Sequence, residues 1–170
     1  VKALKKYNVP IGVAVHPARN SSQKLKNAGV TEVKYSVETM DRKIFDQVCR
    51  GRKGDSLDFI LESLRDAVRV FGRDKVSSNI IIGLGETDEG VREGVEYLAR
   101  MGVIPVLRPI TISPLRKDDL TMATRPSAER LLELTRMTQE ILEKYDLHPE
   151  LSRTMCLPCT GCDLSPYHDF

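Results

Sequence analysis

Three cysteines near the C-terminal end have the spacing that most directly predicts chemistry. Cys156, Cys159 and Cys162 recur at every third position, and such close neighbours rarely satisfy disulfide geometry together. A CxxCxxC run is instead typical of iron-sulfur ligands, and Pro158 with Gly161 lets the backbone wrap around a metal. We predict that these cysteines bind an iron-sulfur cluster, with a structural zinc ion or unligated thiols as the alternatives.

The fourth ligand of this site is not evident from the sequence. Cys49, Asp163 and His168 are candidates, and an open iron that binds substrate would need none of them. A single cysteine such as Cys49 is more often a buried thiol than a ligand. Zinc sites commonly pair two CxxC units across a longer gap, so the spacing favours a cluster over zinc.

A second set of polar residues occurs where strands are expected to end. In parallel barrels, ligand sites gather at the C-terminal ends of the strands and in the loops that follow them. Each residue also has a structural explanation when taken singly, because a carboxylate at a strand end is often paired or solvated. The positions in this set are His16, Ser36 with Glu38, the run 83–86 and the run 108–113.

The run 83–86 has the sequence Gly-Leu-Gly-Glu. Gly83 and Gly85 permit a positive φ and the close approach of another group, so a ring or a carboxylate of a ligand fits against the backbone there. An ordinary turn between a strand and a helix uses glycine for the same reason. The two glycines alone therefore leave a ligand site and a plain turn as alternatives.

The elements that position these residues alternate between short β-branched runs and longer amphipathic runs, which is typical of βα units around a parallel sheet. In the strand expected over 32–38, the odd positions are apolar, whereas Lys34, Ser36 and Glu38 predict a polar inner face that lines a cavity. The strand expected over 77–82 is apolar enough for burial on both faces. We expect strands over 11–15, 32–38, 77–82 and 103–112, helices over 22–28, 57–71, 87–101 and 126–145, and the end of another helix over 1–7.

Four strands that are each followed by a helix predict an α/β fold. The expected architecture is a partial (β/α)6 barrel of the TIM type over residues 1–147, followed by an irregular tail over 148–170 that contains the CxxCxxC run. Four parallel strands leave exposed sheet edges, so a complete barrel requires strands upstream. With 170 residues, of which 41% are hydrophobic, the chain is large enough for one core.

The composition argues against several classes of function. The chain has 26 Lys and Arg and 24 Asp and Glu, a formal net charge of +2 without a long block of one sign, so neither a nucleic-acid nor a membrane surface is expected. No apolar run approaches the roughly 20 residues that span a bilayer, and the N-terminus lacks the apolar segment of a signal peptide. We expect a cytoplasmic protein whose cysteines bind metal.

Three of the strand-end segments resemble segments of one family, and they occur in the same order. The run 79–87 resembles the strand-five segment of biotin synthases and lipoyl synthases, in which a GLGET run ends the strand. The run 35–40 is similar to their fourth strand with its Asn-x-Asp or Asn-x-Glu motif, and 105–115 resembles their sixth strand. By this resemblance, over residues 10–145, the chain is identified as a member of the radical S-adenosylmethionine (SAM) superfamily, related to biotin synthase.

The resemblance implies a cofactor and a reaction. Members of the superfamily use a 4Fe-4S cluster and a low-potential electron donor to split SAM into methionine and a 5'-deoxyadenosyl radical. The radical abstracts hydrogen from an unactivated C–H position of a small-molecule substrate. By the same resemblance, Ser36 and Glu38 contact the ribose hydroxyls or methionine amine of SAM, Ile81 gives a backbone contact to adenine, and Arg50 or Arg52 binds the carboxylate.

The chain departs from the family pattern at three places, the first of which is Ser36, where the family more usually has Asn. Asn79 replaces the first glycine of a GxIxGxxE pattern, although Ile81, Gly83 and Glu86 remain in register. The CxxxCxxC loop that binds the catalytic cluster is absent from the sequence. We therefore expect that loop upstream of Val1, and we predict that the tail cysteines hold an auxiliary cluster.

Two other classes of function remain as alternatives. A non-radical barrel lyase, similar to an aldolase, would use Glu38 and a lysine such as Lys34 on a carbonyl substrate. A non-catalytic module would bind zinc through the tail cysteines, for structure or for docking a partner. Iron and sulfide in anaerobically purified protein would favour the radical enzyme, whereas stoichiometric zinc alone would oppose it.

Overall fold

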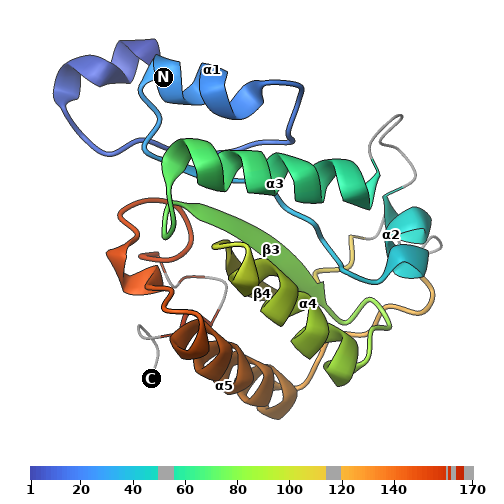
Figure 1. Ribbon diagram of the computed structural model, residues 1–170. Helices are drawn as coiled ribbons and strands as arrows, with labels where there is room; N and C mark the ends of the chain where they lie inside the picture. Colours follow the sequence, from blue (N-terminus) through green and yellow to red (C-terminus); the bar gives the residue numbers. More distant parts are fainter. Residues whose placement is uncertain (50–55, 114–119, 160, 162–163, 167–170) are drawn as a thin grey trace.

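Four parallel strands form one sheet, in which the spatial order β1-β2-β3-β4 is also the order along the chain (Figure 1). Each strand therefore pairs with the next one in sequence, as consecutive βα units do. The predicted α/β fold, a partial barrel of parallel strands with helices between them, is confirmed. The computed structural model describes residues 1–49, 56–113, 120–159, 161 and 164–166.

The longer helices begin where the sequence supplies a capping side chain. Ser56, Thr87 and Ser127 each accept a hydrogen bond from the amide three residues later, over 3.1 to 3.2 Å, which satisfies a first-turn donor. The helix expected over 87–101 accordingly begins at Asp88, with Thr87 as its cap. The elements are η1 (Lys2–Tyr7), β1 (Gly12–Ala14), α1 (Ser21–Ala28), β2 (Glu32–Lys34), α2 (Arg42–Val48), α3 (Leu57–Phe71), β3 (Val76–Ile82), α4 (Asp88–Arg100), β4 (Ile104–Pro109), α5 (Ala128–Lys144) and η3 (Pro149–Leu151).

The helices pack on one face of the sheet, here called the outer face, and Figure 1 shows α4 in front of the strands and α3 alongside β3. The main hydrophobic core lies between this face and the helices, and it includes Val33, Tyr35 and Val37, all fully buried. Alternate strand residues point to the opposite, inner face. By the pairing register, the inner-face residues are Gly12, Ala14, Glu32, Lys34, Ser77, Asn79, Ile81, Ile104, Val106 and Arg108.

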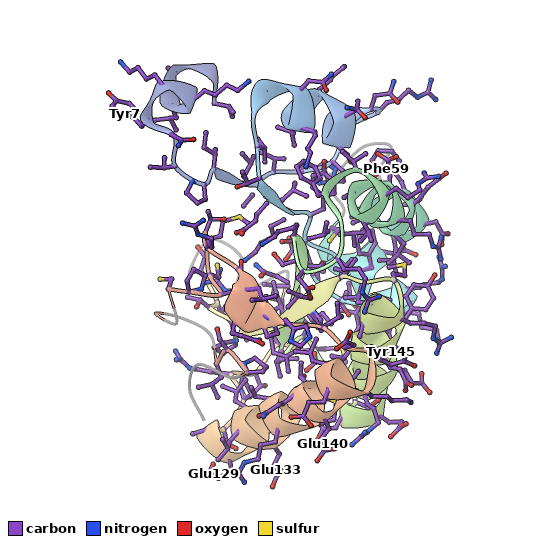
Figure 2. All side chains as sticks on the ribbon, turned by 60° about the vertical axis from the view of Figure 1, so that its left-hand side comes forward. Tyr7, Phe59, Glu129, Glu133, Glu140 and Tyr145 are labelled. Atoms are coloured by element: carbon purple, nitrogen blue, oxygen red, sulfur yellow. The ribbon has the colours of Figure 1, made fainter. Side chains whose placement is uncertain are left out.

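Helix α5 shows how the amphipathic pattern of the sequence is used. Figure 2 shows Glu129, Glu133 and Glu140 pointing away from the molecule, whereas Leu134 and Ile141 on its other side are buried in the core. Period-3.6 spacing of apolar residues therefore sets which side of the helix meets the sheet. Within the described ranges, none of the helices is both long and apolar enough to cross a membrane.

The tail covers the part of the inner face nearest the N-terminal ends of the strands. The carboxylate of Glu32 accepts hydrogen bonds from the Ser152 hydroxyl (3.1 Å), the Arg153 amide (3.0 Å) and the Thr154 hydroxyl. Leu157, only 3% exposed, packs with the two inner-face aliphatic residues of β4 in a small separate cluster. The C-terminal half of the inner face is left for the cavity described below.

Strand β2 is shorter than the sequence predicts, because a side chain interrupts its ladder. The Val37 amide donates to the Ser78 hydroxyl over 3.0 Å, so a backbone carbonyl is not used at this position. The chain rejoins β3 only at Glu38, through an isolated bridge to Ile80. The expected strand 32–38 therefore ends at Lys34.

Three other features of the elements differ from what the sequence predicts. Helix α2 was not predicted, since it has seven residues and a single fully buried side chain, Phe45; the signal for it is Asp41, whose carboxylate caps it. The segment expected as the end of an α-helix is the 3-10 helix η1. Strand β3 is not buried on both faces throughout, because Asn79 and Ile81 are only partly buried on the inner face.

Candidate functional site

A cavity of about 630 Å³ opens on the inner face at the C-terminal ends of β2, β3 and β4. Its volume lies in the range of small-molecule sites, and in parallel α/β folds this end of the sheet is where ligands bind. The structure brings three predicted residues together here: Ser36, Glu38 and Ile81. The other residues that line it are Val48, Cys49, Asn79, Leu84, Arg108, Pro109, Ile110, Thr111, Ser113 and Leu120.

Glu38 has an unusual backbone conformation at the edge of this cavity. Its φ is 66°, in the left-handed region that non-glycine residues seldom adopt. Two backbone hydrogen bonds to β3 hold it there, from the Glu38 amide to the Asn79 carbonyl (3.1 Å) and from the Ile81 amide to the Glu38 carbonyl (2.7 Å). Such conformations persist where the surroundings enforce them, and they cluster at functional sites.

Asn79 contributes a buried polar atom at the same place. Its Oδ1 is buried and accepts no hydrogen bond within the described part of the chain. An unpaired buried acceptor costs about 1–3 kcal/mol, and a donor group of a bound ligand or a water molecule would remove that cost. The substitution of asparagine for the expected glycine thus places a hydrogen-bonding group on the cavity wall.

Arg108 is a cavity residue to which the sequence interpretation gave no specific role. It lies on β4, beside Ile81 in the pairing register, and it lines the same cavity as Glu38. The signal that would have found it is the period of two along β4, which places Arg108 on the inner face together with Ile104 and Val106. A guanidinium there is suited to a carboxylate or phosphate group.

The Gly-Leu-Gly-Glu turn is held by its own glutamate. Glu86 accepts hydrogen bonds from the amides of Gly83 (2.8 Å) and Leu84 (2.7 Å), and Arg130 of α5 donates to the same carboxylate over 3.0 Å. Burial lowers the pKa of Arg130, but its contacts with Asp88 and Glu86 outweigh burial and raise it. Glu86, which belongs to the strand-end run 83–86 expected near a ligand, therefore shapes the turn in this structure.

The two glycines of this turn also lie outside the inner-face cavity. The space beside Gly83 (φ 105°) is filled by another segment of the chain, since a Cβ there would be 2.2 Å from the carbonyl oxygen of Thr124. Gly85 and Glu86 line a different cavity, of about 590 Å³, between the first turns of α2 and α4. That cavity lies on the outer side of the sheet and contains neither Ser36 nor Glu38, so Gly85 and Glu86 line a different cavity from these two residues.

The tail brings one predicted metal ligand onto the inner face. Cys156 Sγ accepts a hydrogen bond from Lys34 Nζ over 2.9 Å, and the Cys159 amide donates to the Cys156 carbonyl over 3.0 Å, which closes a turn between the two cysteines. Cys162 lies outside the described residues. Among the residues that are described, no three His, Cys, Asp or Glu side chains form a metal-binding group.

Other predicted residues fall apart from these two places or outside the structure. Cys49, a candidate fourth ligand, lines the strand-end cavity instead of the cysteine turn. His16 is exposed and is not among the residues that line either cavity. Arg50 and Arg52, Asp163 and His168 lie outside the described residues.

Comparisons with known proteins agree with this architecture. The model of the radical SAM superfamily matches residues 2–98. Coproporphyrinogen III oxidase (HemN) from Escherichia coli, a radical SAM enzyme, has a similar structure, with a TM-score of 0.62, 16% identity, and coverage of 85% of this chain and 36% of its own. A radical SAM methyltransferase from Sphaerobacter thermophilus gives a TM-score of 0.55 and 18% identity over 83% of this chain and 40% of its own. The comparison with curated proteins found no match.

Proposed function

Because this chain belongs to the radical SAM superfamily, we propose that its inner-face cavity binds S-adenosylmethionine in a radical SAM enzyme. The chain spans less than half of the length of the two enzymes of similar structure. In this superfamily an iron-sulfur cluster reductively cleaves SAM to methionine and a 5'-deoxyadenosyl radical for hydrogen abstraction from an unactivated C–H position. The part of the chemistry that belongs to the present residues is to bind and orient SAM and to exclude water.

The observation that carries the proposal is the set of polar groups that meet in the cavity. Glu38 and Ser36 follow β2, and Asn79 reaches the cavity wall from β3. SAM has an amine, two ribose hydroxyls and an adenine amino group, all of which donate hydrogen bonds. Carboxylate, hydroxyl and unpaired amide oxygens are acceptors for such donors, so the residues present fit this ligand.

The family resemblance implies a backbone contact between Ile81 and adenine, but the backbone amide of Ile81 already has a partner. Its amide already donates to the Glu38 carbonyl over 2.7 Å, while its side chain is partly exposed in the cavity. We therefore propose that Ile81 contacts the adenine through its side chain or carbonyl group. The carboxylate of SAM is assigned by the family resemblance to Arg50 or Arg52, and Arg108 is a further candidate from the cavity itself.

In this structure Lys34, the lysine named for the lyase alternative, does not face the cavity of Glu38. Lys34 is only 3% exposed, its ammonium donates to Cys156, and it is not among the residues that line the cavity of Glu38. A Schiff-base lysine must reach the carbonyl carbon of its substrate. The geometry therefore favours a radical SAM enzyme over a lyase. It does not indicate whether biotin, lipoyl groups or another compound is the product.

We further propose that the tail cysteines hold an auxiliary iron-sulfur cluster. The closed turn between Cys156 and Cys159 and the position of Cys162 three residues later agree with a CxxCxxC ligand run. A structural zinc ion is the alternative, and analysis of iron, sulfide and zinc in anaerobically purified protein distinguishes the two metals. A low-potential electron donor and a small-molecule substrate complete the proposal, and a cytoplasmic location stays a prediction.

The SAM site is tested by comparing Glu38→Gln with Glu89→Gln, an exposed glutamate of α4. Losing a hydrogen bond to a charged group costs about 1.5–3 kcal/mol, so Glu38→Gln should weaken SAM binding about 10- to 100-fold, as measured by equilibrium dialysis with labelled SAM. The full chain is used, anaerobically and after reconstitution with iron and sulfide. Equal binding by wild type and Glu38→Gln would refute the assignment of this cavity.

A further inference from the structure

Lys34 is a buried cation whose surroundings are unusual. It lies on the inner face of β2 with 3% of its surface exposed. Buried lysines normally pair with a carboxylate, yet within the described part of the chain Lys34 makes no ion pair, and the hydrogen bond of its ammonium goes to Cys156 Sγ. The neighbouring inner-face carboxylate, Glu32, is occupied by the tail and by Lys75.

The position of Cys156 is fixed from both sides along the tail. Before it, Ser152 and Thr154 are bound through their hydroxyls to the Glu32 carboxylate, as is the Arg153 amide. After it, Leu157 is buried against β4. The sulfur of Cys156 is therefore presented to Lys34 by an anchored segment, although the two residues are 122 positions apart in the sequence.

We propose that Lys34 is a positioning residue for a metal centre held by Cys156 and Cys159. Its ammonium donates a hydrogen bond to the Cys156 sulfur, which fixes the direction of that ligand, and its charge offsets the negative charge of thiolates bound to a metal. Groups that hydrogen-bond to metal ligands commonly govern affinity, and charge near an iron-sulfur cluster sets its reduction potential. The inference rests on the proposal above that the tail binds a metal.

The same contact places the Cys156 sulfur relative to the inner-face cavity. Lys34 and Glu38 are four residues apart on one segment, so their backbones are separated by at most about 14 Å. Both residues belong to the inner side of the sheet, and Asn79 and Val106 lie between the two levels in the pairing register. The Cys156 sulfur that Lys34 contacts therefore lies on the same face of the sheet as the cavity, toward the N-terminal ends of the strands.

The experiment compares Lys34→Met, Lys34→Arg and Lys24→Gln, a control at an exposed lysine of α1, in the full chain. Each protein is reconstituted anaerobically with ferrous iron and sulfide, and its iron content, absorption and electron paramagnetic resonance spectra and midpoint potential are measured. Lys34→Met keeps the length and the apolar stem of the side chain but removes the charge. We expect it to bind iron about 10-fold more weakly in a chelator competition and to shift the midpoint potential to more negative values.

Lys34→Arg keeps the charge and a donor, so it should restore most of the potential even if the spectrum changes, and Lys24→Gln should match wild type. Wild-type iron affinity, spectra and potential in Lys34→Met would overturn the role of Lys34. Cys156→Ser separates this result from failure of the tail site. If Cys156→Ser loses iron while Lys34→Met is unchanged, only the role of Lys34 fails; if Cys156→Ser keeps all of its iron, the tail site itself fails and Lys34 with it.

Discussion

Arg130 of α5 and Glu86 of the β3–α4 turn are joined by a hydrogen bond of 3.0 Å between the guanidinium and the carboxylate. The same carboxylate accepts the amides of Gly83 and Leu84, and its side chain is only 5% exposed. A single glutamate thus connects the end of β3 to a helix that begins more than forty residues later in the chain. The shape of the turn depends on this connection.

Replacing Glu86 should therefore destabilise the fold. Glu86→Ala leaves two turn amides without their acceptor and removes one of the two carboxylates that Arg130 contacts, which should cost about 1–3 kcal/mol in the free energy of unfolding, measured by urea titration. Glu89→Gln, exposed on the next helix, is the control and should change stability by less than about 0.5 kcal/mol. Equal stabilities for the two variants would show that the carboxylate of Glu86 does not hold the turn.

The two glycines of the turn should respond differently to alanine. Both have positive φ, 105° at Gly83 and 107° at Gly85, so each substitution incurs backbone strain of about 1–3 kcal/mol. At Gly83 the new Cβ would also be 2.2 Å from the Thr124 carbonyl oxygen, whereas at Gly85 the closest neighbour is a flexible methionine methyl group at 3.9 Å.

Gly83→Ala should therefore lose about 1–3 kcal/mol more than Gly85→Ala because of overpacking. Thermal unfolding followed by circular dichroism measures the difference, and each variant acts as the control of the other. If the two melting temperatures are the same, the segment containing Thr124 does not pack against the turn as the structure has it.

Acid pH should weaken the anchoring of the tail, because it protonates the Glu32 carboxylate that holds the tail. Burial raises the pKa of Glu32, but hydrogen bonds from Thr154, Arg153 and Ser152 and the charge of Lys75 outweigh it, so the pKa lies below its usual value. A carboxyl with a lowered pKa in the folded state contributes stability above the unfolded pKa of about 4.3, and this contribution disappears as the pH falls through the folded pKa.

Wild type should accordingly be more stable than Glu32→Gln at pH 7, and the difference should shrink as the pH is lowered below about 4. Urea unfolding of both proteins between pH 7 and pH 3 measures this difference directly, which removes the effect of the other acidic groups. A difference that stays constant over this range would mean that the charge of Glu32 does not anchor the tail.

A methyl group added at Gly12, where the tail packs on β1, should detach this part of the tail from the sheet. A Cβ at Gly12 would be 2.1 Å from the Thr154 hydroxyl oxygen and 2.8 Å from Met155 Cγ, so Gly12→Ala should displace this part of the tail from the sheet. Limited trypsin digestion should then cleave after Arg153, the exposed residue next to it, faster than in wild type. Ala14→Ser, at an exposed position on the same strand, is the control; equal cleavage rates in both variants would contradict the packing of the tail on β1.

The amino-acid pattern was sufficient for features that depend on neighbours along the chain. The alternation of βα units and the apolar period of α3, α4 and α5 predicted the parallel sheet and its helix-covered face, because each helix or strand buries one side. The start of α4 also depends on neighbouring residues, since the Thr87 hydroxyl accepts from an amide only three residues away. Ser36 and Glu38 line one cavity with Ile81, because the C-terminal ends of parallel strands share one edge of the sheet.

Contacts between distant segments were decided only by the folded structure. Sequence spacing does not show that the Ser78 hydroxyl ends β2 by taking the Val37 amide, or that Glu86 is satisfied by its own turn and α5. The strongest case is Lys34 with Cys156, which are 122 residues apart. Their hydrogen bond depends on where the tail packs on the sheet. That packing is decided by all the surfaces that compete for burial. The local periodicity of the sequence does not contain this information.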